Sequence, residues 1–88
     1  MITLKSNNFD KYINSIPKVL VMFASPTCLK CKQALKEIDF EELRDEGLEL
    51  LYIDGNKWDE ISDRFEIEYF PTFICFINGK QVYRHTPE

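Results

Sequence analysis

Residues 19–31 have the sequence Val-Leu-Val-Met-Phe-Ala-Ser-Pro-Thr-Cys-Leu-Lys-Cys. The first six residues are apolar and include β-branched side chains, a pattern typical of a strand buried on both faces of a parallel sheet. Ser25-Pro26-Thr27 interrupts the run, and a long helix is predicted to follow from about Cys28. The sequence therefore predicts a Cys-x-x-Cys motif at the N-terminus of a helix, directly after a buried strand.

The rest of the chain alternates predicted strands and helices. Strands are expected at residues 2–4, 48–53, 73–77 and 80–85, and helices at residues 9–16, 40–46 and 58–65. Asn78-Gly79 is a strong signal for a two-residue hairpin turn between the last two strands. The order β-α-β-α-β-α-β-β predicts an α/β fold with helices on both faces of a mostly parallel sheet, to which the hairpin adds an antiparallel edge. A chain of 88 residues has no room for two cores, so a single domain over residues 1–88 is expected.

Composition argues against several classes of protein. The net charge of −4 disfavours a nucleic-acid binder, which usually carries a basic surface. No stretch approaches the ~20 apolar residues of a membrane span. The start, Met1–Lys5, lacks the basic region and apolar run of a secretory signal. We therefore expect a cytoplasmic protein with neither nucleic acid nor a membrane as its partner.

Cys28 and Cys31 are the predicted chemical groups. At a helix N-terminus, unpaired backbone N–H groups and the positive end of the helix dipole stabilise a thiolate. Lys30 and Lys32 add positive potential nearby. These features predict that Cys28 is the nucleophile that attacks a disulfide, and that Cys31, one turn into the helix, resolves the mixed disulfide.

Two other interpretations of the cysteines remain. A structural zinc site needs four N or S ligands, and only Cys75 and His85 are left to complete one. Cys75 lies in an apolar strand and His85 in the last hairpin strand, so their convergence with Cys28 is not expected. The second alternative is a pair of ordinary buried cysteines. An odd count of three cysteines fits a reducing compartment with one active pair. We expect no metal, and no cofactor other than the redox-active disulfide Cys28–Cys31.

Five segments of this chain resemble the thioredoxin family in order and spacing. They are Val19–Phe23, Cys28–Cys31, Leu51–Asp54, Phe70–Phe73 and Asn78–Lys80, and the resemblance covers nearly all 88 residues. It implies a thioredoxin-like fold, a three-layer α/β/α arrangement with a mixed central sheet. It also implies a cis peptide bond before Pro71, with Pro71 packed against the dithiol and the backbone of Phe70 bonded to an extended substrate. Thr27, Phe70 and Pro71 are the substrate-binding residues that the resemblance implies.

The chain departs from the family pattern around the dithiol. Thr27 replaces the usual aromatic residue before the first cysteine, and Leu-Lys replaces the Gly-Pro between the cysteines. Met22 occupies the place of the family's buried Asp, and Leu50 the place of the Lys that pairs with it. We therefore expect Lys30 and Met22 to modulate the site. We also expect slow proton transfer at Cys31, because Met22 accepts no proton and the apolar strand keeps water away.

The family's final helix is a further departure. The chain ends at Thr86-Pro87-Glu88, residues typical of a helix start, so the C-terminal helix is expected to be absent or truncated. Such a truncation would leave apolar sheet surface uncovered.

Two functions stay open at this stage. The first is a protein-disulfide oxidoreductase whose partners are protein disulfide substrates and a dithiol reductase or small-thiol electron donor. The second is a redox-inactive binding module that holds a partner in a groove at Phe70-Pro71.

Overall fold

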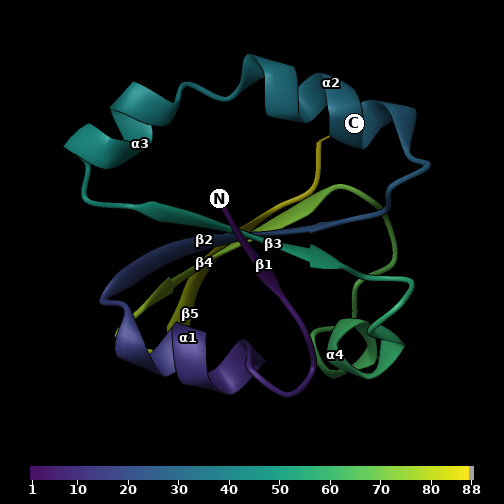
Figure 1. The fold of residues 1–88 in the computed structure, drawn as a ribbon, viewed down its shortest axis with the longest axis horizontal. Coiled ribbons are helices and arrows are strands. Elements are labelled where there is room, and N and C mark those ends of the chain that lie inside the picture. Colours follow the sequence, from purple (N-terminus) through teal and green to yellow (C-terminus); the bar gives the residue numbers. More distant parts are fainter. Residues whose placement is uncertain (88) are drawn as a thin grey trace.

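A five-stranded sheet with the strand order β1-β3-β2-β4-β5 forms the middle layer of the molecule. The computed structural model describes residues 1–87. Its elements are β1 (Ile2–Leu4), α1 (Phe9–Ser15), β2 (Lys18–Ala24), α2 (Leu29–Glu37), α3 (Phe40–Asp45), β3 (Glu49–Asp54), α4 (Asp59–Arg64), β4 (Thr72–Ile77) and β5 (Lys80–His85). Figure 1 shows α2 and α3 on one side of the sheet and α1 and α4 on the other. The predicted three-layer α/β/α architecture with a mixed sheet is confirmed.

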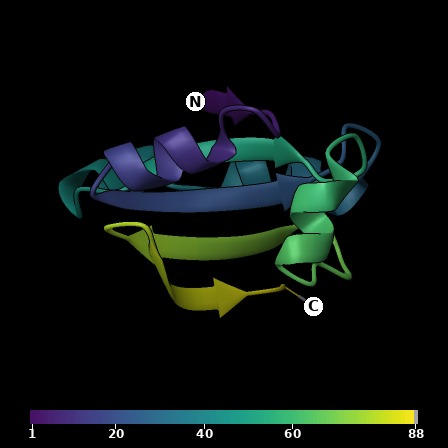
Figure 2. The same cartoon turned by 90° about the horizontal axis from the view of Figure 1, so that it is seen from below.

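The expectation of a mostly parallel sheet is wrong, because two of the four strand pairings are antiparallel. β3 pairs parallel with β1 and β2, but β4 pairs antiparallel with both β2 and β5. The cause is where β4 begins: Thr72 lies opposite Phe23, near the carboxyl end of β2, so the strand must run back along its neighbour. Figure 2 shows the resulting order, with β4 and β5 at the lower edge of the sheet.

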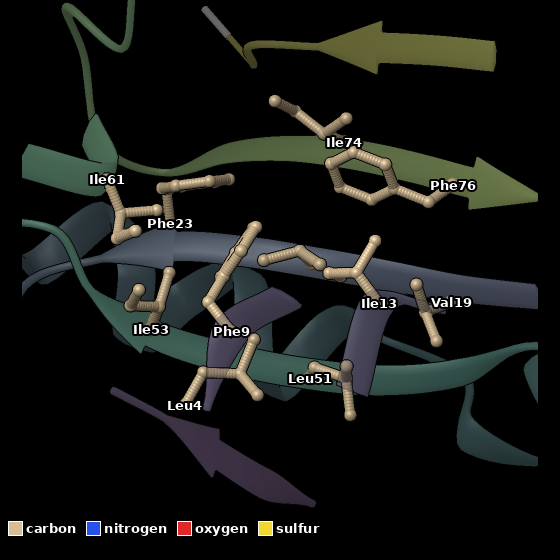
Figure 3. Close-up of a cluster of buried hydrophobic side chains, with 11 residues drawn as sticks. Leu4, Phe9, Ile13, Val19, Phe23, Leu51, Ile53, Ile61, Ile74 and Phe76 are labelled. Carbon is tan, nitrogen blue, oxygen red and sulfur yellow. The ribbon is translucent and has the colours of Figure 1, made fainter. Parts of the chain in front are cut away.

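The main core fills the space between the sheet and α1 with α4. Alternate residues of β2 point to this side, among them Val19, Val21 and Phe23, because successive side chains of a strand face opposite ways. Phe9 of α1 is fully buried here, with its ring centroid 6.3 Å from that of Phe23. Figure 3 shows how these side chains interdigitate. A second, smaller cluster occupies the other face beneath α2, and it contains one of the two motif cysteines.

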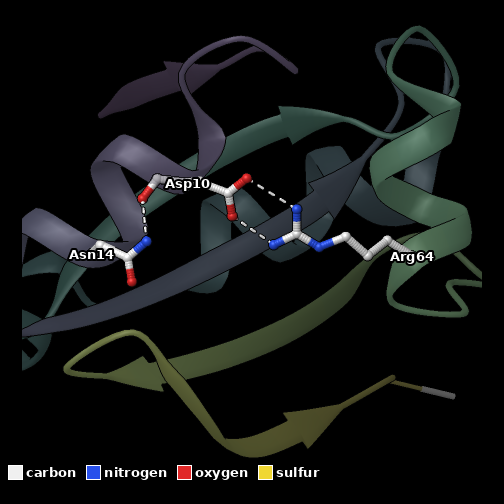
Figure 4. Close-up of polar contacts among 3 residues, drawn as sticks. All are labelled: Asp10, Asn14 and Arg64. Carbon is white, nitrogen blue, oxygen red and sulfur yellow. Dashed lines mark hydrogen bonds and ion pairs between the residues drawn. The ribbon is translucent and has the colours of Figure 1, made fainter.

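An ion pair joins the two helices that cover the main core. The guanidinium of Arg64 in α4 donates two hydrogen bonds to the carboxylate of Asp10 in α1, at 2.6 and 3.0 Å (Figure 4). This arrangement lowers the pKa of Asp10 below its ordinary value. Both side chains are about half exposed, so the pair is expected to contribute no more than about 1 kcal/mol. The helices are held on the sheet mainly by the apolar contacts beneath them.

Local features of the sequence mark the ends of several elements. α1 ends before Pro17, and Asp39 caps α3 by accepting the backbone N–H of Glu42 at 3.1 Å. Gly47 takes a positive φ of 73° at the turn into β3. Within the described residues, no helix has the length and apolar character needed to cross a membrane. The expected helix start at residues 86–88 runs into Glu88, which lies outside the described residues.

Candidate active site

The two motif cysteines lie where β2 leads into α2. Cys28 is the N-cap residue of α2, and its Sγ accepts a hydrogen bond from the backbone N–H of Cys31 at 3.2 Å. Cys28 is half-buried and Cys31 is only 2% exposed, and neither forms a disulfide in this structure. Hydrogen bonds from a backbone N–H favour negative charge on the acceptor. The sulfur of the half-buried Cys28 therefore has a backbone N–H donor directed at it.

A small polar network holds the turn before Cys28. The backbone N–H of Cys28 donates to the carbonyl of Ser25 at 3.1 Å. The hydroxyl of Ser25 lies 3.2 Å from that of Thr27 and accepts a hydrogen bond from the side chain of Asn56 at 3.3 Å. Asn56 follows β3, so the network ties the cysteine turn to the loop after the neighbouring strand. The position of Cys28 is thereby fixed by two strands of the sheet.

The segment at Pro71 lies beside Cys28. The Phe70–Pro71 peptide bond is cis, in agreement with the resemblance, and Pro71 is buried. The carbonyl oxygen of Phe70 is 3.7 Å from the Sγ of Cys28, although the two residues are 42 positions apart in the sequence. The antiparallel course of β4 causes this contact, because it starts β4 at the end of the sheet where β2 stops. Thr27 is exposed at the same end.

A surface groove of about 590 Å³ extends from Phe70. Lys30, from the first turn of α2, lines one part of it, and Tyr69 and Glu68 line another. Arg84 of β5 also lines the groove, with its guanidinium donating to the backbone carbonyls of the α4–β4 connection. Phe70 therefore connects this groove with the sulfur of Cys28.

Cys31 lies in an apolar environment. It packs with Met22, Ala24 and Leu50 in the cluster beneath α2, where Met22 is fully buried. Burial raises the pKa of the Cys31 thiol from an ordinary 9.0 to about 11, and its hydrogen bond with Cys28 contributes further in the same direction. Met22 and Leu50 lie in one cluster, so the two uncharged residues face the same space. None of the buried residues that pack with Cys31 in this cluster carries a charged group that could accept its proton.

The remaining candidate ligands do not join the dithiol. Cys75 lies half-buried on β4, and burial raises its pKa. His85 is exposed on β5, with its ring stacked on that of Tyr83. Among residues 1–87, no three His, Cys, Asp or Glu side chains are grouped so that they could hold a metal ion.

Sequence reasoning missed the contribution of Gly55. A Cβ built on Gly55 would lie 2.7 Å from Cζ of Phe70 and 2.8 Å from the hydroxyl of Ser62. Real Cβ atoms do not approach other atoms so closely, so only glycine allows the Phe70 ring to reach this position. The only available signal was an Asp-Gly-Asn sequence, which is equally typical of an ordinary turn.

Gly55→Ala is expected to destabilise the fold by about 1–3 kcal/mol, the usual cost of forcing extra volume into a packed site. It is also expected to weaken substrate capture, because the displaced Phe70 ring moves the carbonyl beside Cys28. Urea unfolding and a capture assay measure the two effects. Adding Phe70→Leu should make room and restore most of the stability. An unchanged free energy of unfolding in Gly55→Ala would contradict this prediction, because it would show that the Phe70 ring moves aside without destabilising the fold.

Comparisons with known proteins agree with this geometry. The family model described as Thioredoxin matches residues 1–87. Protein disulfide-isomerase 1 of Caenorhabditis elegans is 31% identical over 84 residues, covering 91% of this chain and 17% of that protein. Thioredoxin Y, chloroplastic, of Oryza sativa subsp. japonica is 37% identical over 82 residues, covering 89% of this chain and 48% of that protein. The chain thus spans less than half the length of either relative. The crystal structure of thioredoxin NaTrxh from Nicotiana alata has a TM-score of 0.84 at 24% identity, covering 97% of this chain and 78% of that one.

Proposed function

Because the chain belongs to the thioredoxin family of thiol–disulfide oxidoreductases, we propose that it reduces or exchanges protein disulfides through Cys28 and Cys31. One observation carries the proposal. The Sγ of Cys28 caps a helix, accepts the N–H of Cys31 and lies 3.7 Å from the carbonyl of Phe70. A nucleophilic sulfur is thus next to a backbone acceptor that an incoming chain can use.

The proposed reaction proceeds in two exchanges. The thiolate of Cys28 attacks one sulfur of the substrate disulfide, forming a mixed disulfide and releasing the other sulfur as a thiolate. Cys31 then loses its proton and attacks Cys28, which releases the second substrate thiolate and closes the Cys28–Cys31 disulfide. A dithiol reductase or a small thiol returns two electrons and restores the dithiol. The oxidised pair serves as the only redox group, and we propose no metal.

The substrate is proposed to bind as an extended segment across the end of the sheet. Thr27 and Pro71 flank the sulfur of Cys28, and the backbone of Phe70 bonds the segment. Lys30 lines the adjoining groove and places a positive charge there. Met22 modulates the other sulfur, because its side chain offers no group that could accept the proton of Cys31.

The setting of this activity is also a proposal. We propose that residues 1–88 work as one domain in the cytoplasm, on protein substrates, without nucleic acid or a membrane as partner. The odd count of three cysteines supports a reducing compartment. The net charge of −4 supports the exclusion of nucleic acid.

Insulin reduction by dithiothreitol tests the proposal. The protein is expected to accelerate the precipitation of the insulin B chain, because Cys28 and Cys31 pass electrons faster than free dithiothreitol does. The Cys75→Ser variant is the matched control and should be as active as the unaltered chain, since Cys75 lies away from the dithiol on β4. A chain that binds insulin without accelerating precipitation would instead be a redox-inactive module using the groove at Phe70-Pro71.

A further inference from the structure

The proposed resolving step requires an acceptor for the proton of Cys31. Cys31 must lose it before attacking Cys28, and the fully buried neighbours Met22 and Ala24 have no group that accepts a proton. The partly buried apolar and aromatic residues that pack against this cluster include Tyr52, which carries a hydroxyl. Tyr52 has no part in the substrate binding described above.

The register of the sheet places Tyr52 on the side of Cys31. Tyr52 in β3 is the Cα partner of Met22 in the parallel pairing of β2 and β3. Paired residues of neighbouring strands project to the same face, so Tyr52 and Met22 both face α2. Unlike Met22, Tyr52 is only half-buried, and it lines a surface cavity.

Tyr52 and Cys31 line one surface cavity. Its volume is about 300 Å³, and Lys32 and Leu35 of α2 also line it. Water occupies about 30 Å³ per molecule in the liquid, so this space is large enough for several water molecules. This cavity, which the sequence did not predict, gives solvent a route toward Cys31 past the apolar strand. Cys31 is 2% exposed, and the cavity is where solvent approaches it.

The electrostatics of the phenol fit a neutral group that handles protons. Burial raises the pKa of Tyr52, and the negative charges of Asp54, Cys31 and Cys28 raise it further. Lys32, which also lines the cavity, contributes a positive charge from α2. Tyr52 therefore stays protonated at neutral pH, with one hydrogen to donate and an oxygen that accepts. A neutral phenol also avoids the cost of burying a carboxylate.

We propose that Tyr52 is a proton-relay residue for the resolving step, passing the proton of Cys31 to solvent through the cavity that both residues line. This inference rests on the proposed function. The S–H bond of Cys31 breaks as its sulfur bonds to Cys28, and the electron pair of the Cys28–substrate bond leaves with the substrate thiolate. The released proton moves to the phenol oxygen, directly or through a cavity water, while the phenol's own proton passes to bulk water. Tyr52 ends the step unchanged.

The test uses dithiobis(nitrobenzoate), which reports the two exchanges separately. Attack by Cys28 releases the first coloured thiolate, and resolution by Cys31 releases the second. In Tyr52→Phe, the first phase should be unchanged and the second about tenfold slower at pH 7. This effect is smaller than the roughly 10²–10⁴-fold usual for general acid–base catalysis, because the cavity still gives water access to Cys31. The difference should disappear at high pH, where hydroxide takes the proton. Added imidazole should accelerate the second phase more in Tyr52→Phe than in the unaltered chain.

Tyr12→Phe is the matched control, because Tyr12 is a half-buried tyrosine that packs against the cluster on the opposite face. It should leave both phases unchanged. Equal second phases in Tyr52→Phe and the unaltered chain would overturn the relay while the proposed function stands. A slow second phase that imidazole and high pH do not restore would mean altered packing, and would also overturn it. If the unaltered chain releases neither coloured thiolate, the proposed function itself fails.

Discussion

Cys31→Ser is expected to arrest the protein as a covalent mixed disulfide through Cys28, whereas Cys28→Ser is expected to form no adduct with a disulfide. The sulfur of the half-buried Cys28 accepts the N–H of Cys31 and lies 3.7 Å from the carbonyl oxygen of Phe70, a residue that lines the groove. Cys31 is 2% exposed and cannot meet a protein disulfide first. Removing Cys31 therefore leaves the attack intact and abolishes the only nearby thiol that releases the product.

Non-reducing electrophoresis after mixing each variant with oxidised insulin measures the effect. The expected result is nearly complete conversion to a higher-mass band for Cys31→Ser and no such band for Cys28→Ser. Cys75→Ser serves as the control and should give no stable band, because its dithiol resolves every adduct. Alkylation is an independent check: iodoacetamide should label Cys28 ahead of the other two thiols. First labelling of Cys31 or Cys75 would reverse the assignment.

The fold was predictable from local patterns because each pattern had one consistent structural meaning. The apolar run of β2, the helix spacing after it and the Asn78-Gly79 turn predicted the element order. The balance of parallel and antiparallel pairing was not predictable from them. It depends on where the chain re-enters the sheet after α4, and that is set by the connection that places Thr72 opposite Phe23.

The site was predictable only where its residues are close in sequence. Cys28 and Cys31 form a contiguous motif, and the segment at Pro71 was placed by resemblance. The roles of Gly55 and Tyr52 depend on contacts between separate strands and loops. A tyrosine in an apolar strand has the same local pattern whether it faces the main core or Cys31. Only the pairing of Tyr52 with Met22 decides which face it occupies.

Release of the mixed disulfide is expected to be slow at neutral pH and to speed up steadily as pH rises toward the pKa of Cys31, because the proton of Cys31 is then lost more readily. Burial is the main cause of the raised pKa of Cys31, about 11 in the free dithiol. The second cause, its hydrogen bond with Cys28, is lost once Cys28 is joined to substrate, but burial remains. The rate should therefore keep rising through the neutral range and level off only as pH approaches the pKa that Cys31 has in the mixed disulfide.

Met22→Asp tests whether removal of this proton limits release. The new carboxylate would lie in the cluster with Cys31 and could accept its proton, so release near pH 7 should accelerate and its pH dependence should flatten. The same change should destabilise the fold, because Leu50 offers the carboxylate no positive partner. Burial raises the pKa of such an Asp, so the loss of stability should appear as pH rises above about 4 and should be small in acid. Urea unfolding at both pH values measures it.

Met22→Asn is the matched control for Met22→Asp. It places a polar side chain of the same shape in the cluster, with a comparable packing defect, but its amide accepts no proton at neutral pH. Faster release in Met22→Asp than in Met22→Asn therefore isolates proton transfer from loosened packing. Equal release rates in the two variants would show that proton removal from Cys31 is not limiting. If it is limiting, the carboxylate also bypasses the cavity route, and Tyr52→Phe should slow release less in the Met22→Asp background than in the unaltered chain.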